Sequence, residues 1–262
     1  MNELAILEED DEPASTHGSA DDPDGRAVMV RTITMLCTRV REKHGIRLFL
    51  ADRTHPLDDP ASLRGPELWE LAEYLCMLIV LDEADQVDGV IISGLRGPVP
   101  HPIRFTRDGQ RRCLWIQHRM LGKQSGFRWQ PDLVVTEEAD VPSSDNVLEI
   151  IECKCIRKLN SKTIRSEYAK GVDLEAPAYL IWSYFEVSQH VRNGTQGLGL
   201  HLRTIGLAGP ERSTLLDEDA LVRRVSEGMR TTRETRPLAA ALARRAAAVT
   251  EKADRDRDHR IR

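Results

Sequence analysis

Two short stretches of the sequence place acidic and basic side chains where they can act together. The first is Pro131-Asp132, and the second is Glu152-Cys153-Lys154 within an otherwise apolar segment. Side chains two residues apart on a strand face the same way, with their backbones about 7 Å apart, so Glu152 and Lys154 converge on one spot. Leaving either charge buried without its partner would cost about 3–5 kcal/mol. The position of these two charges on an apolar strand, rather than the tripeptide alone, therefore predicts a paired, chemically useful site.

A predicted β-hairpin brings Asp132 to the same place. Residues 129–136 and 147–156 are predicted to form two strands joined by a polar loop. Two pairing registers fit this loop, and they place Asp132 opposite either Ile151 or Glu152. Directly opposed side chains have Cβ atoms about 5 Å apart. In the second register, two carboxylates and an ammonium group meet at one end of the hairpin.

These residue types suit metal-assisted hydrolysis of a phosphodiester. Mg²⁺ takes oxygen ligands, commonly one or two carboxylates completed by water and substrate phosphate. A bound metal ion lowers the pKa of its water and stabilises charge on the phosphate. Asp132 and Glu152 are the expected ligands of Mg²⁺ or Mn²⁺. Lys154 can orient or deprotonate the attacking water, or neutralise the charge at phosphorus.

Pro131-Asp132, a gap of 19 residues and Glu152-Cys153-Lys154 on an apolar strand together resemble the PD-(D/E)xK nuclease superfamily. The resemblance implies a restriction-endonuclease-like fold, which is a mixed β-sheet flanked by helices. It also implies that Asp132 and Glu152 bind magnesium and that Lys154 serves the nucleophilic water. A Gln-x-x-x-Tyr pattern found in exonuclease-type members is missing, which favours cutting within the DNA chain.

The resemblance further implies a biological setting. Such nucleases act in bacterial defence and restriction, or in DNA repair and recombination. Pairs of these domains cut both strands of a duplex, so a homodimer is expected by analogy, and a partner ATPase or another defence-system subunit can be the activator. Two alternatives stay open: a catalytically silent nucleic-acid-binding protein of the same fold, and an adaptor in which Glu152 and Lys154 are merely a satisfied ion pair.

Many members of this superfamily take a further acid from the helix before the sheet. The helix expected over Pro66–Glu83 offers Glu67, Glu70 and Glu73. If the leucines of this helix face inward, Glu70 points away from the sheet while Glu67 and Glu73 lie on the flanks. We take Glu67 as the candidate catalytic residue. The alternative is that an acid in the first helical turn only stabilises the helix dipole.

A basic segment follows the predicted site. Residues 154–170 hold six basic side chains and one acid, a net charge of +5. Within it, Lys162, Arg165 and Lys170 are expected to contact the phosphates of a nucleic acid, for which we expect DNA. The alternative is a solvated helix face.

The elements that position these residues alternate between helical and extended periodicity, which indicates an α/β fold. Helices are expected over residues 26–43, 66–83 and 161–174, and strands over 90–92, 103–106, 113–118, 179–185 and 198–207, besides the hairpin. We expect four segments: a disordered acidic tail (1–25), an N-terminal helical extension (26–64), a nuclease-like core (65–210) and a charged helical C-terminal extension (211–262).

Composition limits the class of protein. The chain has 262 residues, of which 40% are hydrophobic and 30% charged, which suits one large or two small globular domains. Its longest apolar run, Leu75–Leu81, is too short to span a membrane. Five cysteines without a pairing pattern suit a reducing compartment, so we expect a cytoplasmic protein with no membrane contact. Nine acids lie in residues 1–25, and the remainder carries 37 basic and 33 acidic residues, a net charge of +4.

Overall fold

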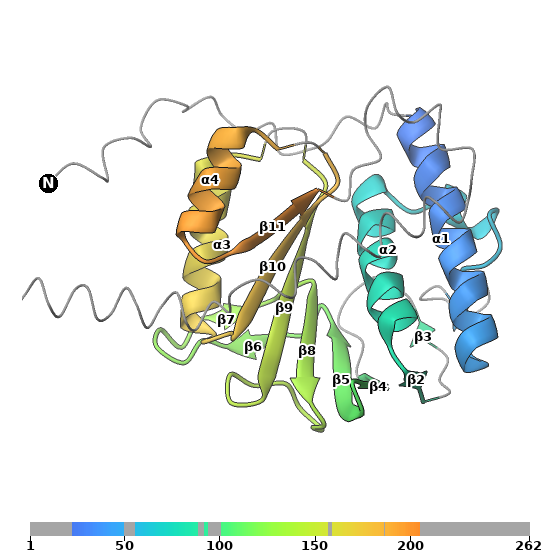
Figure 1. The fold of residues 1–262 in the computed structure, drawn as a ribbon, viewed down its shortest axis with the longest axis horizontal. Helices are drawn as coiled ribbons and strands as arrows, with labels where there is room; N and C mark the ends of the chain where they lie inside the picture. Colours follow the sequence, from blue (N-terminus) through green and yellow to red (C-terminus); the bar gives the residue numbers. More distant parts are fainter. Residues whose placement is uncertain are drawn as a thin grey trace, which may run out of the picture.

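The computed structural model describes residues 23–49, 56–88, 92–93, 101–156, 159–185 and 187–204. This part of the chain is mixed α/β, with a seven-stranded mixed sheet flanked by helices (Figure 1). The helices are α1 (Pro23–His44), α2 (Leu68–Glu83), α3 (Ser161–Asp173) and α4 (Gln189–Gly197), with a short 3-10 helix η2 (Ser62–Arg64). The strands are β1 (Leu48–Phe49), β2 (Gln86–Val87), β3 (Ile92–Ser93), β4 (Ile103–Arg107), β5 (Gln110–Ile116), β6 (Met120–Leu121), β7 (Arg128–Trp129), β8 (Leu133–Glu137), β9 (Val147–Lys154), β10 (Ala178–Ser183) and β11 (His201–Thr204).

The main sheet has the strand order β11-β10-β9-β8-β5-β4-β2. Strands β4, β5, β8 and β9 pair antiparallel in succession. Helix α3 then carries the chain back so that β10 lies parallel to β9, and α4 does the same between β10 and β11. Two small sheets, β1-β3 and β6-β7, lie outside this main sheet.

Helices cover both faces of the sheet, with α1 and α2 on one side and α3 and α4 on the other (Figure 1). Alternation along the strands explains the two cores. On β8, Val135 packs toward α2 while Val134 packs toward α3, and on β9 Ile151 and Ile150 divide in the same way. Such near-continuous apolar strands are typical of sheets buried on both faces.

Helix α2 is buried on all sides, because α1 packs against the side that does not face the sheet. Every residue from Leu71 to Asp82 is buried, so the single inward stripe assumed from the sequence is wrong. The expected N-terminal extension shares one apolar core with α2 and the sheet. Among the described residues, no helix is long and apolar enough to cross a membrane.

The N-terminal helix is longer than expected. It begins at Pro23, where a proline is well tolerated because its missing N–H needs no partner in the first turn. It ends at His44, and Gly45 follows with φ +69°, donating its N–H to the Arg41 carbonyl. The rest of the expected acidic tail and the whole expected C-terminal extension, residues 211–262, lie outside the described residues.

The structure adds one helix that the sequence analysis did not predict. Helix α4 occupies Gln189–Gly197, between the strands expected over 179–185 and 198–207. The Ser188 hydroxyl accepts the Val191 N–H and caps its first turn, and Gly199 (φ +75°) reverses the chain after it. The following strand, β11, falls inside the expected range of 198–207.

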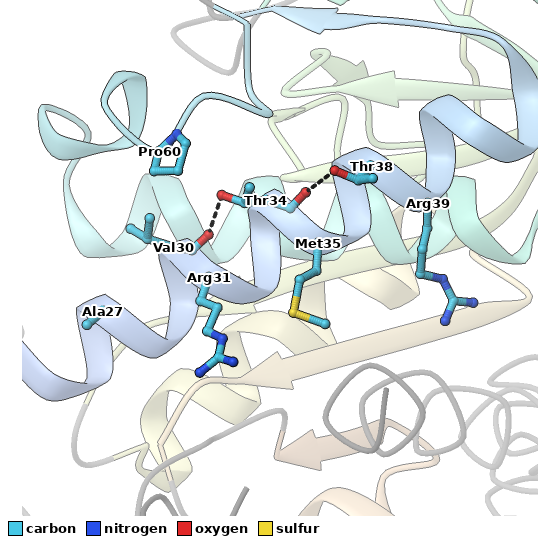
Figure 2. Close-up of a pocket in the computed structure, with 8 residues that line it drawn as sticks. All are labelled: Ala27, Val30, Arg31, Thr34, Met35, Thr38, Arg39 and Pro60. Atoms are coloured by element: carbon cyan, nitrogen blue, oxygen red, sulfur yellow. Dashed lines mark hydrogen bonds between the residues drawn. The ribbon is translucent and has the colours of Figure 1, made fainter. Parts of the chain in front are cut away.

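A hollow lies against helix α1 and is lined by residues of that helix and by Pro60 (Figure 2). In Figure 2 the hydroxyls of Thr34 and Thr38 turn back to donate to carbonyls one turn earlier on α1. Its lining contains no acidic residue, so it offers no carboxylate ligand for a metal ion: Ala27, Val30, Arg31, Thr34, Met35, Thr38, Arg39 and Pro60.

Candidate active site

The β8–β9 hairpin uses both predicted registers, one on each side of a bulge. Thr136 pairs with Val147, the ladder shifts between Val135 and Thr136, and Leu133 then pairs with Ile151. The next position along the ladder brings Asp132 beside Glu152. The Oδ2 atom of Asp132 accepts the backbone N–H of Cys153 at 2.7 Å. The bulge therefore gives the register in which the two acids meet.

Glu152 belongs to a ring of four buried or nearly buried charges, which we call the charge ring: Glu152, Lys154, Glu167 and Lys170. Its Oε2 contacts Lys154 Nζ at 2.9 Å, and its Oε1 contacts Lys170 Nζ at 2.7 Å. The same two ammonium groups contact Glu167, at 2.8 Å from Lys154 and 3.1 Å from Lys170. Glu152 is only 1% exposed, and the two lysines balance its negative charge inside the protein.

Burial and ion pairing act in opposite directions on the ring. Burial lowers the pKa of Lys154, but Glu152 and Glu167 outweigh it and hold that pKa well above its ordinary value. The pKa of Lys170 is raised in the same way. Burial raises the pKa of Glu167, but the two lysines outweigh it and the net shift is downward. Tyr179 donates its hydroxyl to Glu167 Oε2 at 2.6 Å and completes the ring. The raised pKa values keep both lysines cationic at neutral pH, which suits Lys154 to stabilising charge rather than to removing protons.

Glu73, rather than Glu67, is the helix acid that lies near the two predicted metal ligands. It is 5% exposed, and its Oε2 accepts the side-chain amide N–H of Gln117 at 2.8 Å. Burial, followed by the charge of Asp132, raises the pKa of Glu73 to about 8. Burial and the charge of Glu152 raise the pKa of Asp132 to about 7, against the opposing effect of Lys154. Mutual repulsion of this kind requires the three acids to share one region.

The choice of Glu67 in the sequence analysis is not supported by its position. Helix α2 begins at Leu68, so Glu67 is the exposed N-cap residue. Its backbone N–H donates to Glu70 Oε2 at 2.6 Å, which ties Glu70 to the helix start. Glu70 is buried, contrary to the expectation that it points away from the core. The alternative weighed for Glu67, stabilisation of the first helical turn, matches this arrangement.

The three basic residues expected at phosphates have different positions. Lys170 lies inside the charge ring, where it neutralises Glu152 and Glu167. This corrects the expectation that it is an outer phosphate contact. Lys162 and Arg165 are exposed on α3 and stay candidates for nucleic-acid contact.

Gln117 contacts the site through both its backbone and its side chain, and its backbone conformation is strained. It follows β5 directly, and its φ of +47° lies in the left-handed region that non-glycine residues rarely adopt. Its N–H donates to the Asp132 carbonyl at 2.8 Å while its side chain reaches Glu73. Such strain concentrates at functional sites, where surrounding contacts hold it.

The net charge of the acidic and basic side chains at the site matches one divalent cation. When ionised, the four acids (Glu73, Asp132, Glu152 and Glu167) exceed Lys154 and Lys170 by two negative charges. As they stand, no three acidic, histidine or cysteine side chains in the described part of the chain enclose a metal position. Both Glu152 oxygens are taken by lysines. Mg²⁺ requires only one or two protein carboxylates, so Asp132 and one freed oxygen of Glu152 are sufficient, with Glu73 as a third candidate.

The raised pKa values predict that the metal-free protein loses stability as pH rises. Glu73 and Asp132 titrate at about 8 and about 7 when folded, against ordinary values of 4.5 and 3.8. Between about pH 4 and 8 the folded state thus binds more protons than the unfolded chain, so the free energy of unfolding falls across this range. We expect the Tm in EDTA to drop more steeply between pH 5.5 and 8.5 for the wild type than for Glu73→Gln. Parallel curves for the two proteins would contradict this.

Comparison of the chain with protein-family models, with curated proteins and with solved structures finds no match.

Proposed function

We propose that this protein is a Mg²⁺-dependent nuclease with a restriction-endonuclease-like fold, which hydrolyses phosphodiester bonds within DNA. The observation that carries the proposal is the convergence of Asp132 and Glu152 beside Lys154 at one end of a central hairpin. The order of helix α2, the antiparallel strands β4, β5, β8 and β9, helix α3 and the parallel strand β10 supports the fold assignment. The cellular role we propose, from the resemblance, is bacterial defence or DNA repair.

Each residue of the cluster has a defined task in this proposal. Asp132 and Glu152 would hold the cation, and Glu73 would complete its outer or inner ligands. A bound Mg²⁺ supplies an acidified water and neutralises charge that develops on the phosphate. Lys154 stays protonated and directs its ammonium group toward the same region, where it can stabilise a negatively charged phosphate. Glu167, held by Tyr179, already contacts both lysines and would keep them paired if Glu152 held the cation.

Cleavage by the purified full-length chain tests the proposal. Supercoiled plasmid, linear duplex, single-stranded DNA and RNA are incubated with Mg²⁺, with Mn²⁺ or with EDTA. We expect nicking or linearisation of the plasmid in either metal and none in EDTA. A wild-type protein that binds DNA but cuts no substrate in either metal would favour the catalytically silent alternative. A protein that neither binds nor cuts any of them would contradict the proposal.

Replacing Lys170 by methionine is expected to tighten divalent-cation binding. Lys170 occupies Glu152 Oε1, so it competes directly with a cation for that oxygen. Two unit charges 4 Å apart interact by about 4 kcal/mol at an effective dielectric constant of 20, so removing the ammonium group should raise Mn²⁺ affinity at least about tenfold. Titration of Mn²⁺ followed by electron paramagnetic resonance measures this. Lys170→Arg, which keeps the charge, is the control; equal affinity in the wild type and the methionine variant would contradict the expectation.

A further inference from the structure

The segment between two site residues forms a separate projecting hairpin. Gln117, which contacts Glu73, and Asp132 are joined by residues 118–131, which include β6 and β7. Among the strands that the structure describes, β6 and β7 pair only with each other. Residues 117–130 hold three basic residues and no acidic one. This hairpin is therefore connected to the candidate site at both of its ends.

A buried carboxylate at the end of α3 fixes the hairpin in place. Asp173 is 7% exposed, and its Oδ1 accepts the backbone N–H groups of Gln124 at 3.0 Å and Ser125 at 2.8 Å. Its Oδ2 accepts the Ser125 hydroxyl and the indole N–H of Trp129. Gly122 lies so close that an added Cβ would come within 1.8 Å of the Asp173 carboxylate. The loop is thus held in one conformation by several independent contacts.

The same helix links this anchor to the charge ring. Glu167, Lys170 and Asp173 are spaced three residues apart on α3, which places them along one side of the helix. Lys170 contacts Glu152, and Asp173 contacts the hairpin one turn later, a rise of about 4.5 Å. The anchor of the hairpin therefore lies one helical turn from the charge ring.

The hairpin exposes an aromatic ring in a fixed orientation. Phe127 is 67% exposed and packs edge-to-face on Trp129, with ring centroids 6.4 Å apart. Trp129 is itself fixed by its hydrogen bond to Asp173 at 2.5 Å. Arg128, between the two aromatic residues, is also exposed, whereas Lys123 is paired with Asp145 and Glu175. A rigidly supported, open aromatic face next to a guanidinium group suits stacking on a base beside a phosphate.

We propose that the β6–β7 hairpin is a nucleic-acid-binding element in which Phe127 stacks on an unpaired base and Arg128 binds a neighbouring phosphate. The inference rests on the proposed function and specifies its substrate, since an accessible base face requires single-stranded or locally opened DNA. The absence of acidic residues from 117–130 and the direct connection to the site favour a nucleic acid over a protein at this surface.

Binding without cleavage tests this element. Fluorescence anisotropy of a labelled single-stranded oligonucleotide and of the matching duplex is measured in EDTA with the full-length chain. Stacking contributes about 1–3 kcal/mol per base, so Phe127→Ala should weaken single-strand binding about 5- to 150-fold and duplex binding less. Phe127→Trp should retain affinity. Arg128→Ala should reduce the slope of log affinity against log salt by about 0.7 on the single strand.

Leu121→Ala is the matched control, because Leu121 is a 60% exposed apolar side chain on the same hairpin. It should bind both DNA forms like the wild type. Wild-type affinity in Phe127→Ala and Arg128→Ala would overturn the hairpin proposal while leaving the nuclease proposal standing. A change of oligomeric state in Phe127→Ala, with unchanged DNA binding, would assign the surface to a protein partner instead. A wild type that binds no DNA would overturn both proposals.

Discussion

Replacing Lys154 by methionine is expected to reduce DNA cleavage about 10²- to 10⁴-fold while leaving divalent-cation binding intact or tighter. Lys154 contacts Glu152 and Glu167 at 2.9 and 2.8 Å and its pKa is raised, so the task we propose for it is to stabilise charge. The methionine side chain is apolar and of similar length, so it fills the space without the charge. Single-turnover cleavage at saturating Mg²⁺ measures the loss, and Mn²⁺ titration measures the cation affinity.

The stability of the Lys154 variant must be followed in parallel. Removing one partner of a buried pair leaves the other unbalanced, at a cost of about 3–5 kcal/mol. Here Lys170 still contacts both acids, so we expect a lower Tm in a protein that stays folded. Lys154→Arg keeps the charge and should retain part of the activity. Wild-type cleavage rates in folded Lys154→Met would remove Lys154 from the mechanism.

The second large effect is expected at Glu73, with Glu67 as its matched control on the same helix. Glu73→Gln keeps the size of the side chain but removes a charge that interacts with Asp132 and Glu152. We expect divalent-cation affinity and cleavage to fall about 10- to 100-fold, the range typical of groups that support metal ligands. The pH dependence of metal-free stability should also become shallower.

Glu67→Gln should leave cation affinity and cleavage unchanged, because Glu67 is the exposed N-cap residue before α2. Its contacts are a reciprocal capping box with Glu70: the Glu67 side chain accepts the Glu70 backbone N–H, and the Glu67 backbone N–H donates to the Glu70 carboxylate. The expected effect is a small loss of stability from the helix start. Loss of cation binding in Glu67→Gln and not in Glu73→Gln would reverse our assignment.

Local patterns were sufficient to predict the hairpin and its charges. The position of Glu152 relative to Lys154 depends only on the two-residue period of a strand, and the loop length restricted Asp132 to two registers. Sequence alone did not indicate that a bulge at Val135 and Thr136 would allow both. The mixed α/β class followed from periodicity in the same way.

The residues missed by sequence analysis depend on packing between distant elements. Glu73 was not distinguished from Glu67 because the burial of α2 depends on α1, about 40 positions earlier. Lys170 looked like one more charge in a basic run, since nothing local shows that α3 lays it against Glu152, 18 residues before it. The pairing of Glu167 with Tyr179 across 12 residues was hidden for the same reason.

Direct cation binding tests the central claim, that Asp132 and Glu152 form a divalent-metal site. Mn²⁺ binding to the metal-free wild type at pH 8, followed by electron paramagnetic resonance, is compared with binding to Asp132→Asn, whose fold is checked by circular dichroism. We predict saturable binding of Mn²⁺ to the wild type, displaced by excess Mg²⁺, and its loss in the variant. A wild type that binds no Mn²⁺, or a variant that binds it equally well, would contradict the account.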